Sequence, residues 1–98
     1  MTLRQKQSKF AHDVVLLILY AEAMGYEVTF GDAARMDRRG HVRGSDHYKR
    51  LAIDLNLFCN GKYLRETSAH GCLGEFWESL GRKWGGRFKK KDGNHYAY

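Results

Sequence analysis

Apolar residues in the first quarter of the chain recur with the period of an α-helix. Their spacing of mostly three or four residues places them on one face of such a helix. Gly25 follows the last of them, at the position where a glycine commonly ends a helix. The pattern therefore predicts an amphipathic helix that ends near Gly25. The apolar positions are Phe10, Val14, Leu17, Ile18, Ala21 and Met24.

Alternating patterns farther along the chain predict strands and a hairpin. Residues 26–30 (YEVTF) are aromatic and β-branched, as is typical of a short strand. In residues 51–58 (LAIDLNLF) every second position is Leu or Ile, so one face is apolar and the other carries Asp54. Asn60-Gly61 is a strong hairpin signal, and the following KYL is the expected return strand. Residues 31–46 lack any periodicity and are expected to form a loop, which at this length is often functional.

The last third of the chain predicts a second helix and two more strands. Apolar residues at helical spacing occupy positions 73–80, and Gly81 ends the pattern. Short strands are expected around residues 84–88 and 95–98, with a turn at residues 92–94 (DGN) between them. Helices interspersed with strands and a hairpin indicate an α+β fold, in which helices pack on a mostly antiparallel sheet.

Length and composition narrow the possible functions. With 98 residues the chain has room for one domain, spanning 1–98, and not for a doubly wound nucleotide-binding sheet. The net charge of +6 favours anionic partners, either nucleic acid or the polymers of a cell envelope. Cys59 and Cys72 make no disulfide framework, and we expect free thiols.

The sequence contains no evident targeting or membrane segment. The first residues (MTLRQKQSKF) are polar, unlike a signal peptide. The longest apolar run, residues 14–19, is far too short to span a bilayer. We therefore expect synthesis in the cytoplasm, with no transmembrane segment.

Histidine and aspartate residues supply the candidate chemistry. His47 precedes the strand that carries Asp54, and His95 begins the last strand. His47 and Asp54 would lie about 23 Å apart in an extended chain, so they meet only if the chain turns back between them. Two histidines and one carboxylate with an open fourth position form a ligand set of catalytic zinc, and Asp92 is placed to act as a base. Alternatively, these histidines and aspartates are ordinary polar residues of the protein surface.

Three blocks of sequence resemble a known family. The blocks are residues 45–47 (SDH) and, after six intervening residues, Asp54; then residues 84–88 (WGGRF); and then residues 92–96 (DGNHY). They occur in the order seen in that family. They resemble the zinc peptidases of the D-Ala-D-Ala carboxypeptidase and L-alanyl-D-glutamate endopeptidase family. The phage endolysin branch is the most similar, and the likeness covers nearly the whole chain. It implies the Hedgehog/DD-peptidase fold.

The resemblance implies roles for individual residues. His47, Asp54 and His95 would be the zinc ligands. Asp92 would be the catalytic acid and base. Arg35 would help to bind the substrate and to stabilise the oxyanion that forms at the scissile carbonyl.

The resemblance also implies a substrate-binding role for Ser45. Trp84 is expected either to line the substrate cleft or to pack in the core. The sequence departs from the family pattern at Met36, where Thr is usual, and at Arg50, where many members have Gly.

The resemblance predicts a zinc-dependent endolysin, an antimicrobial hydrolase that cleaves the L-Ala–D-Glu bond of peptidoglycan stem peptides. A D-Ala-D-Ala carboxypeptidase with the same site is the first alternative. A small basic nucleic-acid-binding protein or metal nuclease is the second, although no nucleic-acid-binding motif is present. A non-catalytic wall-binding module is the third. We expect a monomer that is made in the host bacterium, acts on the cell wall and leaves the cytoplasm with a membrane-permeabilising helper.

Overall fold

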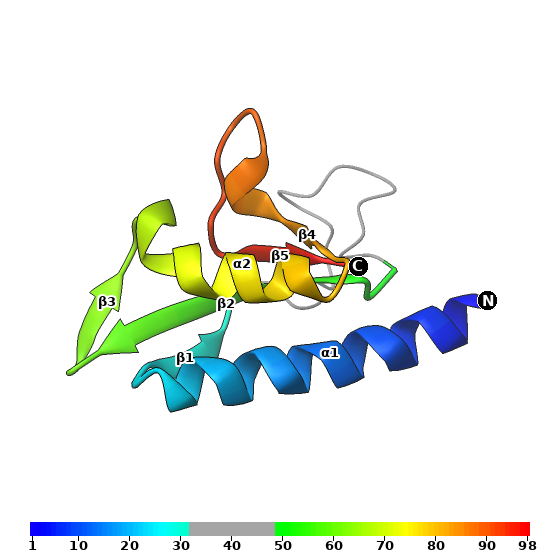
Figure 1. The fold of residues 1–98 in the computed structure, drawn as a ribbon, viewed down its shortest axis with the longest axis horizontal. Helices are drawn as coiled ribbons and strands as arrows, with labels where there is room; N and C mark the ends of the chain where they lie inside the picture. Colours follow the sequence, from blue (N-terminus) through cyan, green and yellow to red (C-terminus); the bar gives the residue numbers. More distant parts are fainter. Residues whose placement is uncertain (32–48) are drawn as a thin grey trace.

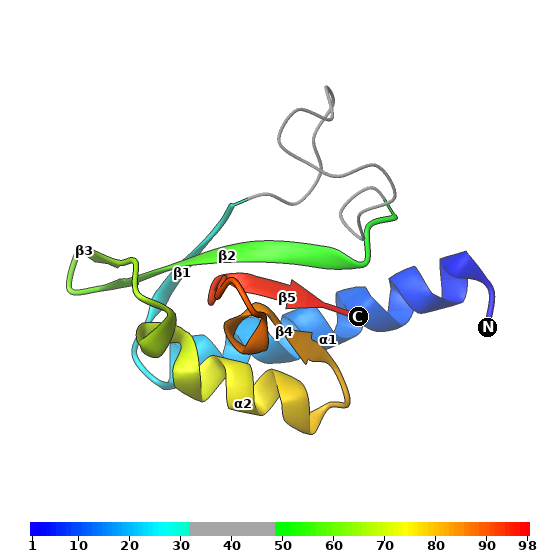
Figure 2. The same cartoon turned by 90° about the horizontal axis from the view of Figure 1, so that it is seen from above.

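The computed structural model describes residues 1–31 and 49–98 of the chain. Five antiparallel strands form one sheet with the order β1-β2-β5-β4, and β3 pairs with β2 in a hairpin. Both helices lie on the same side of this sheet (Figure 1, Figure 2). The expected α+β architecture is thus confirmed. The elements are α1 (Leu3–Ala23), β1 (Glu27–Phe30), β2 (Ala52–Cys59), β3 (Lys62–Leu64), the 3-10 turn η1 (Thr67–His70), α2 (Gly71–Ser79), β4 (Lys83–Trp84), the 3-10 turn η2 (Gly85–Arg87) and β5 (His95–Ala97).

Helix α1 forms as its apolar period predicts. Its first turn is closed by a capping box, in which the Thr2 hydroxyl accepts the Gln5 backbone N–H and the Gln5 side chain accepts the Thr2 N–H. Leu17 and Ala21, on the predicted face, are fully buried. Gly25 follows the helix with a φ of +92°, a conformation that favours glycine. The predicted end of the helix is confirmed.

Strand β2 is the centre of the sheet because its alternation suits a half-buried position. Its apolar residues face the helices, and Asp54 and Asn56 lie on the other face. Asn60 and Gly61 both have positive φ, +52° and +79°, as a type I′ hairpin turn requires. The predicted hairpin is therefore confirmed, with β3 as the return strand.

The end of the chain differs in part from its sequence pattern. Helix α2 and the glycine after it, Gly81 with a φ of +80°, are as predicted. The strand expected over residues 84–88 is wrong beyond Trp84, because the chain turns into η2 instead. The Gly85 carbonyl accepts the N–H groups of both Phe88 and Asp92, and a residue within a strand ladder could not do so.

Aromatic side chains join the two helices to each other and to the sheet. Phe10 of α1 meets Trp77 of α2 edge to face at 5.8 Å, and Trp77 meets Tyr96 of β5 at 6.0 Å. The Trp77 indole N–H donates to the carbonyls of Lys83 and Ala97, both 3.0 Å away. The core therefore fixes α2 against β4 and β5. No helix in the described part of the chain has the length and apolarity needed to cross a membrane.

A buried ion pair ties α1 to the end of α2, and the sequence pattern did not reveal it. The Asp13 side chain is 2% exposed, and Arg82 donates to it through Nε at 2.8 Å. Burial alone would raise the pKa of Asp13, but hydrogen bonds from Arg82 and His12 and the charge of Lys9 lower it overall. Cys59 and Cys72 are both free thiols, as expected.

Candidate metal centre

Strand pairing brings Asp54 and His95 together although they are 41 residues apart in sequence. They are directly opposed in the antiparallel register of β2 and β5, so both side chains lie on the same face of the sheet. His95 Nδ1 lies 3.2 Å from Asp54 Oδ1. Their side chains are 15% and 18% exposed, which leaves this pair half-buried and still accessible from solvent. The pair lies on the sheet face opposite Ile53 and Tyr96, which pack in the core.

Asp92 completes a group with the chemistry of a metal site. One ligand atom from each of Asp54, Asp92 and His95 lies within 4.8 Å of the other two. Two carboxylates and an imidazole are oxygen and nitrogen donors that suit zinc, which is bound by three or four such ligands. Asp54 and His95 are two of the three zinc ligands that the resemblance implies, and Asp92, the expected acid and base, lies with them.

The turn that presents Asp92 and His95 is held by backbone hydrogen bonds on several sides. The Asp92 N–H donates to the Gly85 carbonyl at 3.0 Å, and the His95 N–H donates to the Asp92 carbonyl at 3.1 Å. The Leu55 N–H donates to the Asn94 carbonyl at 2.9 Å, which joins the turn to β2. The backbone positions of all three candidate metal-site residues are thereby coupled.

Two glycines allow the neighbouring segments to approach this turn closely. A Cβ atom on Gly85 would lie 2.1 Å from the Asp92 carbonyl oxygen and 2.8 Å from the His95 Cβ. A Cβ atom on Gly93 would lie 2.6 Å from the Thr67 Cα in η1. Any side chain at either position would displace the turn. The glycines are therefore a condition for the geometry of the group.

Trp84 supports the site from the core. Its ring is packed so closely against Gly74 of α2 and Gly86 of η2 that a Cβ atom on either glycine would overlap it. Its indole N–H donates to the Gly93 carbonyl at 2.7 Å, in the middle of the site turn. Trp84 is 6% exposed, and this burial favours the core interpretation over a contact with the substrate.

A buried histidine that the sequence analysis did not single out lies directly behind β5. His70 is 2% exposed, and its Nδ1 lies 2.7 Å from the hydroxyl of Tyr96, the residue after His95. Burial lowers the pKa of His70 to about 4 and raises that of Tyr96, so both groups are neutral at pH 7. The sequence around His70, at the start of the second helix, gives no indication of this contact, because Tyr96 is 26 residues away.

Three predicted site residues, Arg35, Ser45 and His47, lie outside the described residues. The chain leaves the described part at Gly31, whose N–H donates to the Asp54 carbonyl at 2.7 Å. It returns at a turn that includes Arg50, with a φ of +56°. This left-handed conformation explains a preference for Gly at this position, and Arg adopts it here. A turn at Lys49 and Arg50 thus lies directly before β2, in the stretch where the spacing of His47 and Asp54 led us to expect one.

Comparison with known proteins agrees with this geometry. A family model described as D-alanyl-D-alanine carboxypeptidase matches residues 39–98, which is more than half of the chain. The chain belongs to this family of peptidases. No curated protein matches the sequence.

Membership of this family indicates which reaction the group of Asp54, Asp92 and His95 could serve. The matched residues include β2, β5 and the turn before β5, and therefore Asp54, Asp92 and His95. Peptidases of this family are zinc-dependent and act on peptidoglycan, and the donors that converge here are of the type that zinc binds. The chain is accordingly a zinc-type metallopeptidase at the level of its family.

Proposed function

We propose that residues 1–98 form a single zinc peptidase domain that hydrolyses a bond in the stem peptides of bacterial peptidoglycan. The convergence of Asp54, Asp92 and His95 within 4.8 Å, inside the segment that matches the peptidase family, is the observation that carries this proposal. Peptidoglycan lies outside the cytoplasmic membrane, so the proposed place of action is the cell wall. The proposed working form is a monomer.

The proposal divides the group into two ligands and one proton carrier. Asp54 and His95 are half-buried on adjacent strands, which suits side chains that must hold an ion in a fixed geometry. His47, which precedes the Arg50 turn, is the proposed third ligand. When bound in such a site, zinc lowers the pKa of its water to about 7 and polarises a carbonyl oxygen.

Asp92 is the proposed general base and acid. It is exposed on the turn, where its carboxylate can meet both the attacking water and the substrate. It accepts a proton from the water as the scissile carbonyl carbon is attacked, and then returns that proton to the leaving amine. The hydrogen bond from its backbone N–H to the Gly85 carbonyl holds the main chain of Asp92 in place.

Arg35 and Ser45 are the proposed substrate-binding residues. A guanidinium at Arg35 would hydrogen-bond the carbonyl oxygen as negative charge develops on it, which is commonly a large contribution to catalysis. Gly31, four residues before Arg35, donates its N–H to the Asp54 carbonyl. The segment that contains Arg35 therefore begins beside the metal group. The proposed contribution of Trp84 to catalysis is to hold the turn that carries Asp92. The alternative prediction for this residue is a direct contact with the substrate.

The proposed scissile bond is L-Ala–D-Glu, as in the phage endolysins that the sequence resembles. The second candidate is the D-Ala-D-Ala bond, which the description of the matched family favours. Digestion of purified Gram-negative peptidoglycan distinguishes the two bonds. A new N-terminal D-Glu indicates the endopeptidase, and free D-Ala indicates the carboxypeptidase. Absence of both products from a digest by zinc-loaded protein would contradict the proposal.

Replacement of Asp92 separates catalysis from metal binding. Because Asp92 is assigned to proton transfer, Asp92→Ala should keep its zinc and lose roughly 10²- to 10⁴-fold in kcat. Zinc content by mass spectrometry under native conditions and the rate of fragment release measure the two effects. Loss of zinc from this variant would instead make Asp92 a ligand.

A further inference from the structure

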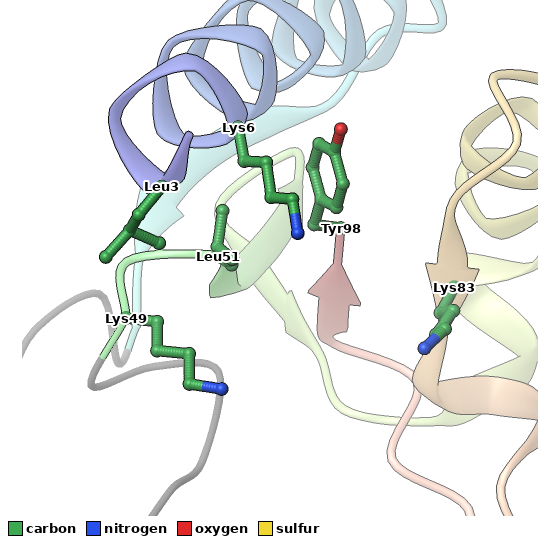
Figure 3. Close-up of a pocket in the computed structure, with 6 residues that line it drawn as sticks. All are labelled: Leu3, Lys6, Lys49, Leu51, Lys83 and Tyr98. Atoms are coloured by element: carbon green, nitrogen blue, oxygen red, sulfur yellow. The ribbon is translucent and has the colours of Figure 1, made fainter. Parts of the chain in front are cut away.

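A pocket of about 390 Å³ lies at the end of the sheet where the chain returns into β2. Four separate segments contribute to it: the start of α1, the Arg50 turn, β4 and the C-terminal residue (Figure 3). The lining residues are Leu3, Lys6, Lys49, Leu51, Lys83 and Tyr98.

Three lysine side chains surround the open space of this pocket. Figure 3 shows the ammonium groups of Lys6, Lys49 and Lys83 directed toward it from different sides. Within residues 1–31 and 49–98, none of the three forms an ion pair with a carboxylate. Three ammonium groups around one open space create a positive potential that favours an anion there.

The rest of the lining is apolar and held in place. Leu51 is buried, and its carbonyl accepts the Tyr98 N–H at 2.8 Å. The Gln7 side chain donates to the Lys49 carbonyl at 2.7 Å, which fixes the turn to α1. The backbone of the pocket is therefore preformed, and Leu3, Leu51 and Tyr98 offer an apolar surface beside the charges.

We propose that this pocket binds a phosphate ester. Lysine ammonium groups are compact point charges that bind phosphate from several directions, whereas a planar carboxylate is matched best by the fork of an arginine. The apolar surface suits the organic part of the ester.

The proposed phosphate pocket is distinct from the metal group but close to it. Leu51, directly before β2, precedes Asp54 by three residues, and Tyr98, directly after β5, follows His95 by three. Extended chain of this length spans about 10 Å. Alternation places the two sites toward opposite faces of the sheet. A bound phosphate ester would anchor the protein on a phosphate-bearing surface without filling the metal group. This inference does not depend on the peptidase activity.

The test compares two variants that lose the same charge. In the first, Lys6, Lys49 and Lys83 are all replaced by Gln. In the second, the exposed run Lys89, Lys90 and Lys91, which lies outside the pocket, is replaced by Gln. Both variants retain the metal-site residues, so phosphate bound to a metal there contributes equally. Calorimetric titration of the zinc-loaded proteins with inorganic phosphate and with hexyl phosphate gives the affinities, and circular dichroism confirms folding.

We expect the wild-type protein to bind hexyl phosphate more tightly than inorganic phosphate. The pocket variant should bind hexyl phosphate at least about tenfold more weakly, and the control variant less than about threefold more weakly. Equal weakening of both variants, or no binding by the wild type at about 10 mM, would overturn the proposal. Should the triple variant fail to fold, Lys83→Gln against Lys90→Gln gives the same comparison.

A second arm identifies the source of the phosphate. Sedimentation with vesicles of phosphatidylcholine alone, or with added phosphatidylglycerol, tests a lipid headgroup. Lysine-dependent binding to the anionic vesicles indicates a membrane lipid. Binding of hexyl phosphate without vesicle binding indicates a soluble or polymer-borne phosphate ester.

Discussion

The two faces of the β2–β5 strand pair place polar groups under opposite conditions. On the helix side, Tyr96 is fully buried, and its hydroxyl meets one buried partner, His70. On the other side, Asp54 and His95 are half-buried and converge with Asp92. Successive residues of the same strand thus serve the core and the candidate metal centre in turn, because side chains alternate across a sheet.

The comparison shows how a small domain can position a metal group. The core-side contacts all act on the same short turn: Trp84 holds the Gly93 carbonyl, Thr67 packs on Gly93, and Tyr96 adjoins His95. Gathering two carboxylates on the solvent side is unfavourable through like-charge repulsion, and a bound cation offsets this. The core therefore holds the turn in place, and the opposite face carries the proposed ligands of the ion.

The largest expected effect comes from removing a ligand on the site face. His95→Ala should weaken zinc binding by at least about a hundredfold, since it removes the imidazole from the proposed ligand set of His47, Asp54 and His95. Asn56→Ala, on the same face of β2 two residues from Asp54, is the matched control and should retain zinc. Competition with a fluorescent chelator measures both affinities. Equal zinc affinity in the two variants would place the metal elsewhere.

A smaller effect is expected from crowding the core face. In Gly74→Ala the added methyl group overlaps the Trp84 ring, so the free energy of unfolding should fall by roughly 1–3 kcal/mol. Gly71→Ala, in the same helix with nothing within 4 Å, should instead gain up to about 1 kcal/mol. Urea unfolding gives both values. A Gly74→Ala protein as stable as wild type would show that Trp84 is loosely held.

The pH dependence of stability tests the buried His70. Unfolded His70 takes up a proton below about pH 6.5, whereas the folded residue does so only below about pH 4. The free energy of unfolding should therefore be highest above pH 6.5 and fall by up to about 3 kcal/mol as the pH is lowered to 4. Urea titrations of wild type and His70→Gln at each pH measure this. If the free energy of unfolding fell equally with pH in both proteins, His70 would not be the source of the pH dependence.

Local sequence patterns predict most of the fold. Helical periodicity identifies α1 and α2, strict alternation identifies β2, and Asn60-Gly61 identifies the hairpin. The turn at Gly85 was missed, because WGGRF is compatible with a strand and its true conformation depends on the distant Asp92. Asp13 and His70 were also missed as paired buried groups, since Arg82 and Tyr96 become their partners only in the folded chain.

The candidate site was predictable to a different degree. Spacing alone left Asp54, Asp92 and His95 open to an ordinary surface interpretation, and resemblance to a peptidase family selected them. The register of β2 and β5 then explains why Asp54 meets His95, and the hydrogen-bonded turn before β5 explains why Asp92 joins them. The roles of Arg35, Ser45 and His47 stay predictions, because these residues lie outside the described part of the chain.

The most direct test of the central claim is the release of soluble fragments from purified peptidoglycan by metal-stripped protein, before and after addition of one equivalent of zinc. The zinc-peptidase account predicts no release before the addition, release after it, and loss of release when a chelator is added again. Equal release without metal, or none from folded protein that holds one zinc ion, would contradict it.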